Sequence, residues 1–314
     1  MIYRKLGNSD LNCSVVALGT WGMGGTWGGA DDEQSIAAIH AGLKAGINLI
    51  DTAPPYGDGH SEEVVGRAIK GIRDKVILAT KCGNYREADG IRRPDILPGA
   101  FRRQLEGSLK RLGIDYVDLY QVHWPHFTNM EMGFKELNAL REEGLIRYAG
   151  VSNFDGAQID VCSQFCPIVS LQPPYSLLDR RIDEEILPYC LKNNIGTLTY
   201  GSIGGGVLAG KYAGPPTFDN NGGDPRGEFY DFYSKEAWPK TAAMVDVLRQ
   251  IAAERGRPTV QAAINWVLKQ PGVTVALVGA RTPEQAIMNA AAGDWELSGA
   301  ENERIQAAYE AIFV

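Results

Sequence analysis

The feature that most constrains the fold is an alternation of strand and helix that recurs eight times along the chain. Short apolar, β-branched runs are each followed by a segment with helical spacing of its apolar residues, such as "DEQSIAAIHAGLKAG", "PGAFRRQLEGSLKRLG" or "FKELNALREEG". Because these runs are continuously apolar, both faces of each strand are expected to be covered, as in a parallel sheet. The predicted strands are 15–21, 47–53, 76–81, 117–123, 148–153, 168–174, 196–202 and 274–280.

Eight such repeats in 314 residues favour a closed barrel over an open, doubly wound sheet. We therefore predict an α/β fold, a (β/α)8 TIM barrel forming a single domain over residues 1–314, with long loops on its C-terminal face. The segment "YRKLGNSDLNCSVV" has two short arms around a turn. It predicts a β-hairpin that caps the bottom of the barrel.

Composition narrows the class of partner. The formal net charge is −7 and there is no block of Lys or Arg, which argues against a nucleic-acid or polybasic membrane surface. The N-terminus lacks the apolar core of a signal peptide, and no run approaches the roughly 18 apolar residues of a membrane span. We expect a soluble, cytoplasmic protein with a small-molecule partner, either a monomer or a homo-oligomer. Its five scattered cysteines are expected to be small core residues, with no metal site.

Polar and aromatic residues end nearly every predicted strand. In barrels of this kind the active site lies at the C-terminal ends of the strands. Singly, a turn Asp, a surface Lys or a core His needs no function, but burying all three at one rim is costly unless they are paired. These strand-end residues are Thr20, Trp21, Asp51, Lys81, His123, Ser152, Asn153, Gln172, Tyr200 and Gly279 to Arg281.

Seven motifs occur in one order along the chain: "DTAPPYG…SEEVVGRAI", "ATK", "YQVHWP", "GVSNF", "LQPPYSLLDR", "GGGVLAGKY" and "VGARTPEQ…N". Through them the sequence resembles the aldo-keto reductase family almost end to end. Its "LAGKY" and "GARTPEQ" segments resemble the bacterial and potassium-channel-β-like branches. The resemblance implies an NADP(H)-dependent oxidoreductase that interconverts a carbonyl (aldehyde, ketone or sugar carbonyl) and an alcohol by hydride transfer.

The resemblance also implies a catalytic set of four residues. Tyr56 would be the general acid in reduction and the base in oxidation. A phenol has an ordinary pKa of about 10, so a neighbouring cation is needed to lower it. Lys81 would be that cation, Asp51 would hold its ammonium, and His123 would orient the carbonyl.

A nicotinamide cofactor is implied by the remaining matched positions. Ser152, Asn153 and Gln172 would bind its carboxamide, and Tyr200 would stack on its ring. The cofactor-binding residues expected are Thr20, Trp21, Asp51, Ser152, Asn153, Gln172, Tyr200, Gly201, Ser202, Ile203, Gly205, Lys211, Arg226, Gly279, Arg281, Gln285 and Asn289. A guanidinium suits a phosphate dianion, so Arg281 favours NADP(H) over NAD(H). One departure weakens the adenine side, since Met288 stands where relatives usually carry Glu.

Aromatic residues dominate the loops expected above the rim. The residues expected to bind substrate are Trp21, Trp27, Tyr56, Tyr85, His123 and Trp124. The insert 212–240 is rich in Phe and Tyr; it is interpreted either as a lid over the cofactor, with Arg226 reaching the phosphates, or as a surface loop packed by its own rings. Aromatic surfaces mixed with polar groups favour a sugar or polyol carbonyl.

Two alternatives stay open. The same fold could serve as a cofactor-binding sensor or regulatory subunit with slow turnover. Asp51, His123 and His126 could instead serve a metal-dependent hydrolase or isomerase. The Tyr-Lys pair and the lack of a further carboxylate at the strand ends argue against that second alternative.

Overall fold

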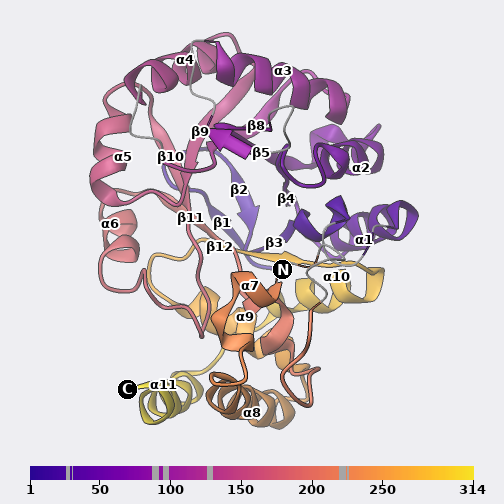
Figure 1. Ribbon diagram of the computed structural model, residues 1–314, viewed down its shortest axis with the longest axis vertical. Helices are drawn as coiled ribbons and strands as arrows, with labels where there is room; N and C mark the ends of the chain where they lie inside the picture. The colour runs from indigo at the N-terminus through magenta and orange to yellow at the C-terminus, as the bar shows by residue number, and fades with distance from the viewer. Residues whose placement is uncertain are drawn as a thin grey trace.

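Eight parallel strands close into a barrel in this computed structural model (Figure 1). The structure describes residues 1–25, 29, 31–86, 92–94, 99–125, 130–218, 224 and 226–314, without the side chains of 84–86 and 92–94. The strands are β3 (Val16–Gly19), β4 (Leu49–Asp51), β5 (Ile77–Cys82), β8 (Val117–Val122), β9 (Ile146–Ser152), β10 (Ile168–Gln172), β11 (Gly196–Thr199) and β12 (Val275–Gly279). They follow one another around the barrel in sequence order, and β12 pairs with β3 to close it. The predicted TIM barrel is confirmed, with each strand inside or within a few residues of its predicted range.

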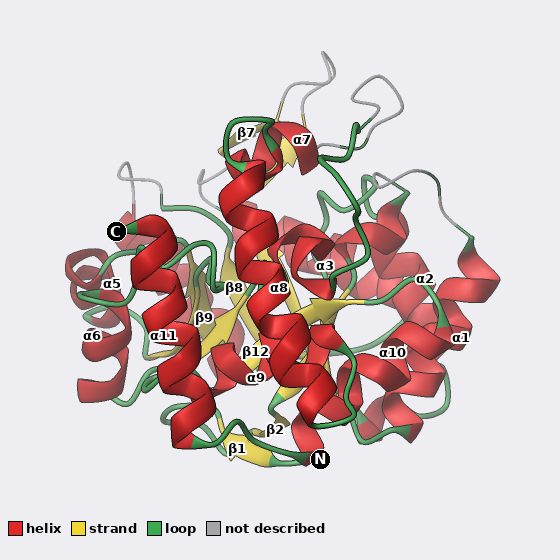
Figure 2. Cartoon of the chain, turned by 90° about the horizontal axis from the view of Figure 1, so that it is seen from below, coloured by secondary structure: helices red, strands yellow, loops and turns green. Residues whose placement is uncertain are grey.

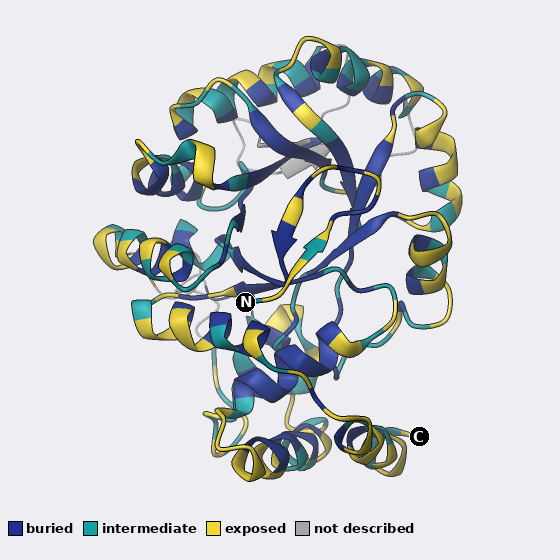
Figure 3. Cartoon of the chain, turned by 180° about the vertical axis from the view of Figure 1, so that it is seen from behind, coloured by how far each residue is buried: buried dark blue, intermediate teal, exposed yellow. Residues whose placement is uncertain are grey.

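Helices surround the barrel, and neighbours in sequence contact one another around most of the ring. The helices are α1 (Asp32–Lys44), α2 (His60–Ile69), α3 (Ala100–Leu112), α4 (Met130–Glu142), α5 (Gly156–Ser163), α6 (Ile186–Lys192), α7 (Arg226–Phe229), α8 (Trp238–Glu254), α9 (Thr259–Lys269), α10 (Pro283–Ala290) and α11 (Gly299–Phe313). Most ring helices bury one stripe and expose the other, although α9 is buried along nearly its whole length. The barrel strands are mostly buried, with exposed positions such as Arg147 of β9 (Figure 3). Helices α8 and α11 pack against each other outside the ring (Figure 1).

The predicted hairpin is present and closes the bottom of the barrel. Strand β1 (Tyr3–Lys5) pairs antiparallel with β2 (Asn12–Ser14). Leu6, Leu11 and Cys13 are buried against the apolar side chains inside the barrel, among them Leu49 and Leu119. The hairpin lies at the opposite end of the molecule from α7 (Figure 2).

Short elements decorate the other end, where the strands finish. They include the 3-10 turns η1 (Trp21–Gly24) and η3 (Gly204–Ala209) and the hairpin of β6 (Asn84–Arg86) and β7 (Arg92–Pro94). Long excursions therefore follow the C-terminal ends of β3, β5 and β11, as expected for the face that carries a site. Among the helices described, none has the length and apolar character needed to cross a membrane.

Candidate functional site

A lysine with no exposed surface lies at the centre of the strand ends. The Nζ of Lys81 donates to Asp51 Oδ2 at 2.6 Å, to the Thr52 carbonyl oxygen at 3.0 Å and to the Tyr56 hydroxyl at 3.2 Å. An ammonium has three protons, and each has an acceptor here. The structure therefore brings Asp51, Tyr56 and Lys81 together as the sequence predicted.

Strand register accounts for this meeting. Asp51 pairs with Ala79 in the ladder between β4 and β5, and Lys81 follows two residues later on the same inward face. Tyr56 reaches the same point from a tight turn, in which its N–H donates to the Ala53 carbonyl oxygen at 3.1 Å.

The environment of Lys81 favours its charged form. Burial by itself lowers the pKa of this lysine, but Asp51 and the Tyr56 hydroxyl outweigh it, so its pKa is raised above the ordinary value. Lys81 consequently stays cationic at neutral pH, directly beside the phenol.

The second oxygen of the Asp51 carboxylate is held by two amides. Gln172 Nε2 donates to Oδ1 at 2.8 Å, and Gln121 Nε2 donates to the same atom at 3.2 Å. Gln121 was not among the predicted site residues. The signal that could have found it is the alternation of the strand, because Gln121 lies two residues before His123 on the same face.

One cavity of about 760 Å³ opens above this cluster. Lys81 is not among the lining residues, but it contacts Asp51 and Tyr56, which are. Trp27 and His126 lie outside the described residues, as does the side chain of Tyr85. The predicted residues that line the cavity are Thr20, Trp21, Asp51, Tyr56, His123, Trp124, Ser152, Asn153, Gln172, Tyr200, Gly201, Ser202, Ile203, Gly205, Lys211, Arg226, Gly279, Arg281, Gln285 and Asn289.

Several lining residues were missed as site residues. Gln34 and Val260 come from helices α1 and α9, which the strand-end rule does not reach. Met288 also lines the cavity.

Amides and hydroxyls meet on one wall of the cavity. Asn153 Nδ2 donates to the His123 carbonyl oxygen at 3.0 Å and to Ser152 Oγ at 3.1 Å, while the Tyr200 hydroxyl donates to Asn153 Oδ1 at 2.9 Å. Burial raises the pKa of Tyr200, so its phenol remains a donor. Gln172 Oε1 accepts no hydrogen bond from the described residues. This wall therefore offers a carboxamide an acceptor in Gln172, and a donor only by exchange of a bond that Asn153 already makes.

A glycine turn forms the next part of the lining. Gly205 has a φ of 59°, and a Cβ added there would lie 2.6 Å from the Tyr230 ring. At Gly205 the backbone therefore borders the cavity without a side chain in between. Lys211 lines the same region. The guanidinium of Arg226 also lies there, paired with Asp224 at 2.9 Å, and this pairing lowers the pKa of the Asp224 carboxyl.

The far end of the cavity is built by the start of α10. Thr282 caps this helix by accepting from the Gln285 N–H at 3.3 Å, and Gln285 Oε1 accepts from the Arg281 N–H at 2.8 Å. Asn289 is buried and donates to the Gly279 carbonyl oxygen at 3.1 Å. Strand end and helix start are thereby fixed to each other.

Aromatic rings wall the cavity around Tyr56. The Trp21 ring stacks on Tyr56 with centroids 6.2 Å apart, and Phe229 of the insert meets Trp21 edge-on at 5.4 Å. The His123 ring lies 6.2 Å from Tyr56 and the same distance from Trp124. The described rings of the insert also pack on one another, as Phe229 does on Tyr230 at 4.7 Å. The packing of these rings on one another agrees with a surface loop packed by its own rings, and the lid over the cofactor stays a prediction.

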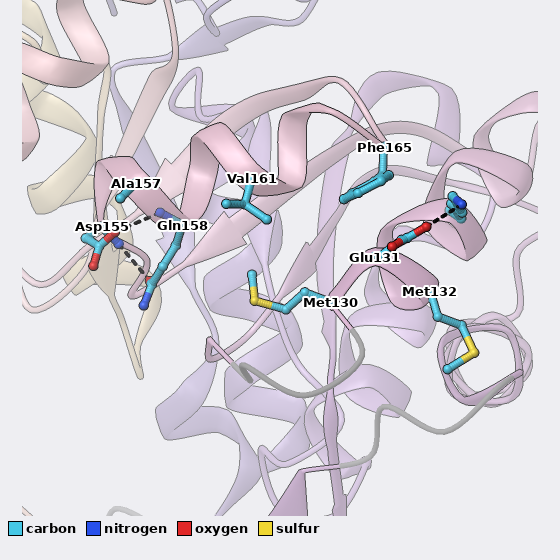
Figure 4. A pocket seen from close by; sticks show the side chains of 9 residues that line it. Met130, Glu131, Met132, Asp155, Ala157, Gln158, Val161 and Phe165 are labelled. Atoms are coloured by element: carbon cyan, nitrogen blue, oxygen red, sulfur yellow. Dashed lines mark hydrogen bonds and ion pairs between the residues drawn. The ribbon is translucent and has the colours of Figure 1, made fainter.

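A second, more open hollow of about 1000 Å³ lies between α4 and α5 (Figure 4). Met130 and Val161 face each other across it, and Glu131 pairs with Lys135 at its edge. It contains none of the strand-end residues. Over the part of the chain that is described, no three His, Cys, Asp or Glu side chains cluster as a metal site would require.

Comparison with known proteins agrees with this geometry. The chain is 40% identical to aldo-keto reductase YhdN of Bacillus subtilis, over 99% of this chain and 94% of the other. It is 35% identical to the NADH-specific methylglyoxal reductase of Escherichia coli, over 98% of each chain.

Solved structures are similar over nearly the whole chain. The glycerol dehydrogenase AKR11B4 of Gluconobacter oxydans matches with a TM-score of 0.89 and 38% identity, covering 99% of this chain and 96% of the other. An aldo/keto reductase of Klebsiella pneumoniae, solved in complex with NADP and acetate, matches with a TM-score of 0.75 and 29% identity, covering 98% and 96%. The model of the aldo/keto reductase family matches residues 15–310. This chain therefore belongs to the aldo/keto reductase family.

Proposed function

We propose that this chain interconverts a carbonyl and an alcohol with a nicotinamide cofactor, using Tyr56 as general acid in reduction and general base in oxidation. One observation carries the proposal. Tyr56 lines the cavity, and its hydroxyl accepts a hydrogen bond from a buried ammonium that Asp51 holds in place. A phenol so placed can give up its proton and be left next to a positive charge.

The chain's own residues manage the proton and the developing negative charge. Reduction builds charge on the carbonyl oxygen, and Tyr56 donates a proton to it while Lys81 stabilises the phenolate that remains. His123 lies beside Tyr56 and offers a second polar contact to that oxygen. The reduced nicotinamide, when bound, supplies the hydride.

The cavity residues fit such a cofactor. Gln172 offers its carboxamide oxygen to the nicotinamide amide, and the bare turn at Gly205 with Lys211 suits a pyrophosphate. Arg226 could join them only by sharing its charge between Asp224 and a phosphate.

Preference for NADP(H) over NAD(H) rests on Arg281 at the far end of the cavity. The relative solved with NADP supports it, whereas the relative named NADH-specific counts against it. Michaelis constants for NADPH and NADH decide the question. A lower constant for NADPH that rises at least tenfold in Arg281→Ala is the expected result, and equal constants contradict the preference.

A small polyol or sugar carbonyl is the substrate class we favour. Aromatic rings and polar groups share the wall around Tyr56, and the names of two relatives refer to glycerol and methylglyoxal. Screening aldehydes, keto sugars and polyols in both directions with NADPH and NADH tests this. Turnover confined to large apolar ketones would contradict it.

The central test is Tyr56→Phe. We expect kcat to fall by a factor of about 10²–10⁴ because the proton donor is lost, while cofactor affinity is kept. Tyr148→Phe, which removes a hydroxyl bonded to the Asp10 N–H at the other end of the barrel, is the matched control and should keep full activity. A fully active Tyr56→Phe enzyme would overturn the mechanism.

Two further measurements separate the alternative functions. Repeated turnover, rather than a single oxidation of bound NADPH, distinguishes an enzyme from a sensor. Activity retained in the presence of a chelator distinguishes it from a metal-dependent enzyme.

A further inference from the structure

Gln121 is a fully buried amide in the middle of the barrel, outside the lining of the cavity. We infer that Gln121 is a positioning residue that fixes Asp51 and Gln172 together, and so couples the proton-transfer residues to the cofactor-binding wall. This inference rests on the proposed function. It concerns how the site is held, since Gln121 contacts neither of the reacting groups.

The hydrogen bonds of Gln121 run to both sides. Its Nε2 donates to Asp51 Oδ1 at 3.2 Å, and its Oε1 accepts from Gln172 Nε2 at 3.3 Å. Gln172 Nε2 also donates to Asp51 Oδ1 at 2.8 Å. Three side chains from β4, β8 and β10 therefore form one closed triangle of hydrogen bonds.

This triangle permits only one orientation of each amide. If Gln121 were flipped, its oxygen would face the Asp51 carboxylate and its nitrogen would face the nitrogen of Gln172. If Gln172 were flipped, its oxygen would face the carboxylate and the Gln121 oxygen at once. Both protons of Gln172 Nε2 are used within the triangle. The carboxamide oxygen of Gln172 is therefore the atom left to meet a ligand.

The neighbouring strands are shaped to admit Gln121. It pairs with Lys81 in the ladder between β5 and β8 and with Gly150 in the ladder between β8 and β9. A Cβ added at Gly150 would lie 3.2 Å from the Gln121 Cγ and 2.4 Å from Ser170 Oγ. Glycine on this side leaves the space that the amide occupies.

Loss of this amide should also alter proton transfer. With one donor fewer, the negative charge of Asp51 acts more strongly on Lys81, and less of the lysine's charge is available to stabilise a phenolate. The titratable groups near Tyr56 in this arrangement include Asp51, Lys81, His123, Tyr200 and Tyr230.

The first test replaces Gln121 by a side chain of similar volume without hydrogen-bonding groups. Gln121→Met should weaken NADPH binding about tenfold, because Gln172 is no longer oriented. The affinity is measured from the change in protein fluorescence on NADPH binding. The limb on which kcat/KM for alcohol oxidation rises with pH, which reports ionisation of the Tyr56 base, should move to higher pH. Asn265→Leu is the matched control: it removes a buried amide of α9 that donates to the Ala292 carbonyl oxygen at 2.9 Å. It should change stability without moving the affinity or the pH limb.

The second variant, Gln121→Glu, keeps the shape of the side chain and replaces the amide by a titratable carboxyl group. While the new carboxyl of Gln121→Glu is protonated, it can donate to Asp51 and accept from Gln172, as the amide does. Once it ionises, two carboxylates face each other, an arrangement that raises the pKa of such a group. We expect near wild-type cofactor affinity at low pH and a loss of tenfold or more as the pH rises, a step that a purely structural role would not produce.

The outcomes separate the two proposals. A wild-type chain that binds no nicotinamide nucleotide would overturn the proposed function together with this inference. A wild-type chain that binds NADPH, with both Gln121 variants matching its affinity and pH profile, would overturn the role of Gln121 alone. If Gln121→Met does not fold, the pH step of Gln121→Glu, or its absence, decides.

Discussion

Lys81 and Asp51 form an ion pair that is almost entirely withdrawn from water. Removing one partner from such a pair leaves an uncompensated buried charge and costs about 3–5 kcal/mol, whereas replacing both costs less. The same two residues therefore contribute both to the stability of the fold and to the proposed catalysis.

A double-mutant cycle tests how strongly Asp51 and Lys81 stabilise each other. Asp51→Asn and Lys81→Met should each lower the free energy of unfolding by about 3–5 kcal/mol, and the double variant by less than the sum of the two. Urea titrations of the four proteins measure it. The singles and the double should all lose activity, because the phenol loses its cation in each. Strictly additive losses of stability would contradict the pairing.

The pH dependence of this pair follows from the raised pKa of Lys81, in which burial is outweighed by Asp51 and Tyr56. A raised folded pKa means that the stabilisation is fully present below the unfolded value of about 10.4 and is lost as pH rises through the higher folded value. Wild-type stability should thus fall more steeply above about pH 10.4 than that of the double variant, which lacks the titrating group. Parallel alkaline profiles from chemical denaturation would contradict this.

At the scale of elements, the turn that carries Tyr56 is held against η1 without spare room. A Cβ added at Gly24 would lie 2.5 Å from the Tyr56 carbonyl carbon, and one added at Gly57 would lie 2.1 Å from the Gly24 carbonyl oxygen. Gly57 also has a φ of 64°. The position of the phenol is therefore set by an element that follows β3 as much as by its own turn.

Gly24→Ala should shift this turn. We expect kcat to fall at least tenfold, because a displacement of about 1 Å at a reacting group can cost about a hundredfold. The change in unfolding free energy should be small by comparison. Gly214→Ala, where an added Cβ would meet nothing within 4 Å, is the control and should leave kcat unchanged. Equal kinetics for the two variants would show that the close approach does not matter.

The barrel strands and most of the strand-end residues could be predicted from the sequence, whereas contacts between separate elements could not. Continuous apolar runs located the strands because burial on both faces leaves that mark, and the strand ends then pointed to Asp51, Lys81 and His123. Strand alternation places Gln121 on the same face as His123, but its contacts with Asp51 and Gln172 depend on how separate strands align, which the local sequence does not show. Gln34 and Val260 escaped because helices bring them to the cavity. The strand predicted over 196–202 stops at Thr199, since the chain turns through Gly201 with a φ of 69°.

At the scale of the whole molecule, the two ends of the barrel have separate tasks. The hairpin end holds apolar side chains such as Leu6, and the opposite end holds the cavity. We propose that residues 1–314 form one domain, which should unfold in a single cooperative step.

Leu6→Ala tests this separation. Leu6 has no exposed surface, so its truncation should lower the free energy of unfolding by about 2–5 kcal/mol. Michaelis constants should stay at their wild-type values, because the change lies at the other end of the barrel. Leu191→Ala, on a side chain that is 62% exposed, is the control and should cost less than about 0.5 kcal/mol. A changed Michaelis constant in Leu6→Ala alone would show that the two ends are coupled.

Closure of the barrel through β12 and β3 has a consequence for the order in which the protein is made. Val16 pairs with Ala276, so the first and last strands of the barrel are neighbours. The cavity likewise takes Trp21 from the beginning of the chain and Asn289 from near its end. During synthesis, the growing polypeptide carries the acid, the lysine and the phenol long before the strand that completes their surroundings leaves the ribosome. A nascent chain therefore carries these side chains separately, and the cavity is complete only once β12 and α10 have been made.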